Sequence, residues 1–174
     1  MTGVTGWRYW SLASDGTLAS PLLWGGSWQP GTAAAACPGR PGRPPGPHGI
    51  LPDPHGIPDP RCGCGWRVMT SLQELFAVWQ AAAVTRQLSL QARLAPLHLD
   101  VCGQATLSGR ICGPDLNSDP CGTLRGQYGE VTGPLATAAP APLAAALAAR
   151  YGTRVIRVPR MTPAAITSAL LPGS

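Results

Sequence analysis

The segment from residue 38 to residue 60 restricts the fold of this chain more than any other feature, because proline and glycine recur throughout it. Proline fixes φ and removes a backbone donor, so the segment cannot form a helix or a central strand. The whole chain carries 22 glycines and 20 prolines among 174 residues, a level at which irregular structure is expected. We therefore predict a single domain over residues 1–158 that contains this long loop, followed by a C-terminal tail or weak helix over residues 159–174.

Outside the loop, hydrophobic spacing and turn residues predict an α+β domain with an antiparallel sheet. The predicted elements are a β-hairpin over 6–28, a helix over 72–83, strands over 97–102, 104–112 and 123–131, a loop over 113–122, a helix over 142–150, a strand over 153–158, and a weak terminal helix that begins at Thr162. Ser71 and Glu74 form an S-x-x-E capping box at the start of the first helix. Gly152 follows the last turn of the second helix, which is the usual stop signal.

Aromatic residues crowd the predicted hairpin. The residues are Trp7, Tyr9, Trp10, Trp24 and Trp28. A tryptophan-rich core and a surface that stacks on a ligand would both use such a cluster, and we favour the core.

The strongest chemical signal is a C-x17-H-x6-C-x-C pattern formed by Cys37, His55, Cys62 and Cys64. Three thiolates and one imidazole make a closed tetrahedral zinc site of the structural kind, which leaves no open position for catalysis. Bound zinc would also fix both ends of the proline-rich loop. The C-x-C spacing is less diagnostic than paired C-x2-C knuckles, and His48 competes with His55 because the segments 48–54 and 55–60 are near copies.

Charge and end composition suggest where the protein works. All 13 basic residues are arginine, and the net charge of +5 permits contact with an acidic partner. The first ten residues carry no apolar run behind a basic cluster, and no 18-residue apolar stretch exists, so we expect a cytoplasmic protein without a membrane span. In the cytoplasm thiols stay reduced, so we interpret the six cysteines as metal ligands or free thiols rather than as disulfides.

Several short motifs recur in a fixed order along most of the chain. They are G-W-R-x-W at 6–10, W-x-P-G at 28–31, Cys37 followed by H-x-x-P-x-x-x-C-x-C-G at 55–65, a V-x-L-x-G-R-V-like segment at 105–111, a G-x-R-x-x-Y/A-like strand at 123–130, and L-A-x-R-Y-G at 147–152. Together they resemble a family of small uncharacterised proteins common in GC-rich actinobacteria. The resemblance implies His55 as the ligand and brings no assigned activity. It does not extend to the insertion at 38–54.

Three further cysteines, Cys102, Cys112 and Cys121, have no counterpart in that family. With His98 they could form a second metal site, but their spacing matches no common zinc motif. We favour small separate thiols.

An enzyme reading finds little support, because no nucleophile elbow, P-loop or dinucleotide fingerprint is present. Arg67, Arg110 and Arg125 could make an anion-binding patch, although arginines along strands more often face solvent. A small enzyme that acts on an anionic ligand held by Arg110 and Arg125 is therefore the weaker alternative. Asp119 reads as a loop-forming residue.

We therefore predict a non-catalytic, zinc-stabilised interaction module that binds a protein partner. The alternative is a nucleic-acid-associated regulator, with Trp66 between Arg61 and Arg67 as its best local patch. The competing interpretation of Trp66, which we favour, is that its indole packs beneath the following helix.

Overall fold

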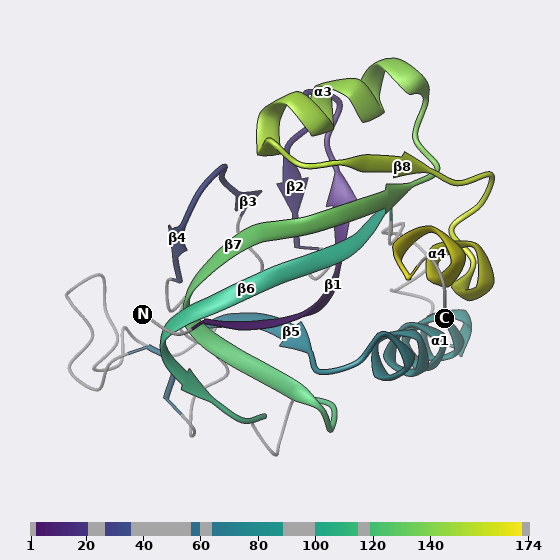
Figure 1. The fold of residues 1–174 in the computed structure, drawn as a ribbon. Helices are drawn as coiled ribbons and strands as arrows, with labels where there is room; N and C mark the ends of the chain where they lie inside the picture. The colour runs from purple at the N-terminus through teal and green to yellow at the C-terminus, as the bar shows by residue number, and fades with distance from the viewer. Residues whose placement is uncertain are drawn as a thin grey trace.

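The computed structural model describes residues 3–20, 27–35, 57–59, 64–88, 100–114 and 119–171, with backbone alone from residue 82 to residue 88. The elements are β1 (Val4–Leu12), β2 (Leu18–Ala19), β3 (Ser27–Trp28), β4 (Ala33–Ala34), β5 (Trp66–Met69), α1 (Leu72–Leu88), β6 (Val101–Cys112), β7 (Thr123–Thr137), α3 (Ala141–Tyr151), β8 (Val155–Arg157) and α4 (Pro163–Leu170). In these residues a mixed sheet of eight strands is joined to three helices (Figure 1), which confirms the predicted α+β class.

The N-terminal hairpin predicted over 6–28 forms in the part that the structure describes, whereas its residues 21–26, with Trp24, lie outside the described residues. β1 and β2 pair antiparallel, with Leu12 opposite Leu18. Asp15 Oδ1 accepts a hydrogen bond from the Thr17 amide at 2.9 Å, and Gly16 takes a φ of 81° that favours glycine. Local side-chain chemistry therefore closes this turn.

Two long strands form the centre of the sheet. The two strands predicted at 97–102 and 104–112 are instead one described strand, β6, because Gly103 lies inside a continuous ladder that bulges but does not end. β7 runs on to Thr137, past the predicted end at Val131. β1 pairs with both β5 and β6, and both of these pair with β7, so four strands form a closed ring of pairings.

The sheet is mixed rather than wholly antiparallel, which corrects the sequence-based expectation. β8 pairs parallel to β7, with Leu135 opposite Val155. Parallel neighbours need a crossover connection, and α3 supplies it between β7 and β8. Gly152 ends α3 in the left-handed conformation at φ 60°, as the sequence predicted.

The capping box at the start of α1 is also confirmed. The Glu74 amide donates to Ser71 Oγ, and the Ser71 amide donates back to the Glu74 carboxylate, both at 3.1 Å. Hydrogen bonds from Thr70 and then Ser71 lower the pKa of Glu74. α1 continues to Leu88, five residues beyond the predicted end at Ala83.

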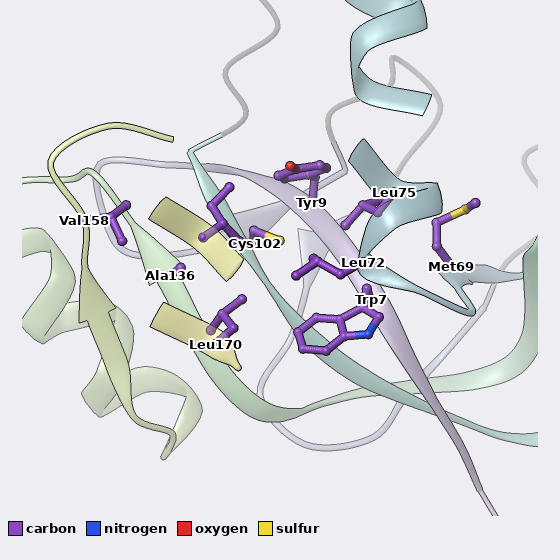
Figure 2. Close-up of a cluster of buried hydrophobic side chains, with 10 residues drawn as sticks. Trp7, Tyr9, Met69, Leu72, Leu75, Cys102, Ala136, Val158 and Leu170 are labelled. Atoms are coloured by element: carbon purple, nitrogen blue, oxygen red, sulfur yellow. The ribbon is translucent and has the colours of Figure 1, made fainter. Parts of the chain in front are cut away.

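Side chains of β1 alternate between two hydrophobic clusters. Trp7 and Tyr9 join the cluster beneath α1 and α4 (Figure 2), whereas Trp10 joins a second cluster with Leu147 of α3. Figure 1 shows α3 apart from α1 and α4, in keeping with this division. The aromatic residues of the hairpin that lie in the described part are therefore core residues, as we favoured.

The C-terminal helix α4 is part of the packed domain. Ile166 is fully buried and Leu170 is 5 % exposed, and both belong to the cluster beneath α1. Thr162 caps α4 by accepting from the Ala165 amide. The predicted terminal helix thus forms and contributes its apolar face to the core.

Candidate metal-binding turn and the buried arginine network

Cys64 is the predicted zinc ligand that the structure describes; it lies two residues before β5 and is 2 % exposed. The other three predicted ligands, Cys37, His55 and Cys62, lie outside the described residues. Among the described residues no group of three or more His, Cys, Asp or Glu side chains could hold a metal ion.

The backbone that carries Cys64 is tightly constrained. Gly65 has a φ of 108°, a conformation that residues with a side chain rarely adopt. A Cβ at Gly65 would lie 2.9 Å from the Cβ of Pro58. The two sides of the segment 60–63 therefore approach closely, and glycine is required beside Cys64.

A buried arginine on β7 contacts the backbone at Asp59 and at Cys64. Arg125 is fully buried, and its Nη1 donates to the carbonyl oxygens of Asp59 at 3.2 Å and Cys64 at 3.3 Å. Its Nε donates to the carbonyl of Gly113 at 3.2 Å and lies 3.1 Å from Asp119 Oδ2. One guanidinium thus joins the Cys64 turn to the connection between β6 and β7.

Asp119 bridges two arginines. Its second carboxylate oxygen lies 2.6 Å from Nε of Arg67, and the Asp119 side chain is only 4 % exposed. Asp119 is therefore a buried ion-pair partner rather than a simple loop residue. The expectation that arginines on strands face solvent is wrong for Arg125, which is fully buried. Arg125 therefore cannot belong to a surface patch that binds an anion together with Arg110.

Trp66 packs in a different place from the one predicted. Its indole lies 4.5 Å from the Trp28 ring, measured between centroids, and its Nε1 donates to the Ala33 carbonyl at 2.8 Å. Trp66 thus belongs with the cluster that contains Trp28, on the side away from α1. The indole is half-buried and does not lie beneath the helix, and Arg61 lies outside the described residues.

Arg8 occupies a second unusual arginine site. Its guanidinium lies 5.0 Å from the centre of the Trp28 ring and donates to the carbonyl of Arg67 and the hydroxyl of Ser20. Burial, followed by the positive charge of Arg67, lowers the pKa of Arg8. Within the described part of the chain no carboxylate pairs with Arg8, so its charge is stabilised by neutral acceptors and the indole face.

The three additional cysteines have three different environments. Cys102 is fully buried in the core, and burial raises the pKa of its thiol. Cys112 faces Arg125 in the β6–β7 ladder, where burial raises its thiol pKa and the positive charge of Arg125 partly offsets that effect. Cys121 is exposed. This dispersion agrees with separate thiols, and His98 lies outside the described residues.

Comparison of the chain with models of protein families, with curated proteins and with solved structures gave no match. The resemblance to the actinobacterial family therefore stays a prediction from motifs. In the described part of the chain, no helix has both the length and the apolar character needed to cross a membrane.

Proposed function

We propose that this protein is a non-catalytic interaction module for a protein partner, stabilised by one zinc ion that Cys37, His55, Cys62 and Cys64 hold. The observation that carries the proposal is the anchoring of Cys64. This residue is buried beside a glycine with positive φ, and its carbonyl oxygen accepts from a buried guanidinium. A structural ligand needs such a fixed and shielded backbone, because thiolate ligands in closed sites are protected from solvent.

The chemistry of the donor set supports a structural role for the ion. Four protein ligands fill a tetrahedral zinc and leave no position at which a water could be activated. The ion would act as a crosslink between residue 37 and the turn at 62–64. Structural zinc contributes on the order of 10 kcal/mol to the folding of small domains, which would offset the entropy of ordering the loop at 38–60.

The nucleic-acid alternative loses its main supports among the described residues. Trp10 and Trp28 are fully buried, and Trp66 packs on Trp28. Arg67 and Arg125 share Asp119 as their counterion. Side chains engaged in this way are not free to stack on bases or to pair with phosphates, so the interaction module is the better supported function.

Metal analysis of the full chain tests the proposal. We expect about one equivalent of zinc in the purified protein, lost from a Cys64→Ser variant and retained in a Cys121→Ser variant, whose cysteine is exposed. Removal of zinc with a chelator should lower the melting temperature of the wild type. Well under one equivalent of metal in the wild type would refute the zinc site, and equal metal in both variants would refute Cys64 as a ligand.

A further inference from the structure

The strand β8 has one unpaired edge in the part of the chain that the structure describes. It pairs with β7 alone and lies at the margin of the sheet (Figure 1). The carbonyl of Arg154 accepts from the Leu135 amide at 2.9 Å, and the Val158 amide donates to the carbonyl of Thr137 at 2.8 Å. The even-numbered residues in and beside β8 therefore direct their backbone groups toward β7.

The backbone groups of Val155 and Arg157 point away from β7, because successive peptide groups of a strand alternate between its two edges. Outside the β7–β8 ladder, neither backbone takes part in a hydrogen bond among the described residues. Unpaired N–H and C=O groups at a sheet edge are a template to which an extended chain can add as a further strand. Pro159 lacks an N–H group, so this template is short.

The surface around this edge is positively charged. Glu130 is the last acidic residue of the sequence, and four arginines follow it. One of the four, Arg150, has the carboxylate of Asp15 at 3.8 Å. The other three are exposed and have no ion pair among the described residues, and they are Arg154, Arg157 and Arg160. A partner segment that carries carboxylates would complement this charge.

The guanidinium of Arg157 is oriented by the fold. Its Nε donates to the carbonyl of Ala139 at 3.1 Å, and its two Nη atoms make no hydrogen bond among the described residues. A guanidinium binds a carboxylate through two parallel N–H bonds, and an arginine that is already held loses less conformational entropy when it does so. Arg157 thus supplies free donors for an acidic side chain next to the unpaired edge.

We propose that the edge formed by Val155 and Arg157 is a docking surface, and that it binds an extended, acidic segment of a protein partner as an additional β-strand. This inference rests on the proposed interaction module, because it names the surface and the chemistry of the partner, and it does not involve zinc. The backbone groups pair with the added strand, and the three exposed arginines select carboxylates. A nucleic acid would use the arginines but not the row of unpaired backbone groups, so a peptide fits the surface better.

The first experiment tests the charge of the surface. Fluorescence anisotropy at moderate salt measures binding of a labelled peptide, in which glutamate alternates with threonine, to the full chain. We expect wild-type protein to bind this peptide and to ignore the same peptide with lysine in place of glutamate. Arg157→Gln should weaken binding by about fivefold or more, because a charge-assisted hydrogen bond is lost. The matched control Arg110→Gln, at an exposed residue of β6, should stay within about twofold of the wild type.

Failure of the wild type to bind the glutamate peptide would overturn the inference, and it would mean that the arginines only protect the edge from self-association. The zinc content tests the proposed function separately, so one equivalent of zinc without peptide binding would leave that function standing. Tighter binding of a single-stranded oligonucleotide than of the peptide at moderate salt would overturn the choice of partner.

The second experiment tests strand addition. Val155→Pro keeps every charge and removes an N–H group that points away from β7, so we expect peptide binding to weaken by about tenfold while the melting temperature reports whether the fold is retained. A measurement on the wild type covers the case in which this variant fails to fold. The glutamate peptide with methylated backbone nitrogens cannot pair as a strand, and its affinity should also fall by about tenfold. Equal affinity for the methylated and unmethylated peptides would overturn strand addition.

Discussion

The guanidinium of Arg125 and the carboxylate of Asp119 lie 3.1 Å apart between Nε and Oδ2, and their side chains are 0 % and 4 % exposed. Burial of an ion pair costs desolvation free energy, which is recovered only when the remaining donors are also satisfied. Three backbone carbonyls accept from Arg125, and Arg67 occupies the second oxygen of Asp119. The pair therefore organises the polar centre of the protein rather than its surface.

Removal of the Asp119 charge should destabilise the fold strongly. Asp119→Asn leaves Arg125 buried without its carboxylate, and loss of one partner of a buried pair costs about 3 kcal/mol or more. Urea denaturation should report this loss of unfolding free energy. The matched control is Asp15→Asn, because Asp15 is exposed and lies 3.8 Å from Arg150, and we expect little change. Similar effects in the two variants would show that the Asp119 pair is not a buried structural element.

The two near-copied histidines should differ in their effect on metal. His48→Ala is expected to leave the zinc content unchanged, whereas His55→Ala should lower it, because His55 stands at the ligand position of the motif. Elemental analysis of the two purified variants measures the difference. Zinc lost from the His48 variant and kept in the His55 variant would assign the site to the other copy.

Truncation of a buried side chain on α4 tests the place of the C-terminal helix in the core. Ile166→Ala removes a fully buried side chain and should lower the unfolding free energy by about 2–5 kcal/mol. Leu171→Ala, at a residue that is 37 % exposed, should cost less than about 1 kcal/mol. Chemical denaturation compares them. A dispensable Ile166 would mean that the domain ends before α4.

Thiol labelling should separate Cys102 from Cys121. Burial raises the pKa of the Cys102 thiol, so the reactive thiolate is scarce at pH 8, and the fully buried sulfur is also shielded from reagents. Cys121 is exposed and should react first. Brief alkylation of the native protein followed by peptide mass spectrometry gives the order, and denaturant should make both residues react. Comparable labelling of Cys102 in the native state would contradict its place in the core.

Any binding to nucleic acid should be weak and electrostatic. The net charge is only +5, and Trp10, Trp28 and Trp66 pack against one another in the sheet. A gel-shift titration at low and moderate salt should show binding at low salt at most, lost as salt is added. Sequence-specific binding that persists at moderate salt would instead favour a regulator.

Features that depend on neighbouring residues could be predicted from the sequence. The capping box of Ser71 and Glu74, the turn at Asp15 and Gly16, and the stop at Gly152 all form as expected. Each depends on side-chain hydrogen bonds or glycine conformations that act within a few residues. The α+β class follows from the same local signals. The zinc ligand set came from spacing and, for His55, from the family resemblance, and for all four residues it stays a prediction.

Tertiary structure decided the features that depend on pairing between distant segments. The parallel placement of β8, the packing of Trp66 on Trp28 and the burial of Arg125 were not predicted. Whether an arginine on a strand is buried depends on which other segments pack over that strand. The carbonyl acceptors of Arg125 come from three separate segments of the chain. Local sequence patterns carry no information about contacts between residues that are distant in the sequence. The sequence thus determined the caps, the turns and most of the elements, but not the strand β5. The register of β5, β6 and β7 determined which charges the fold encloses.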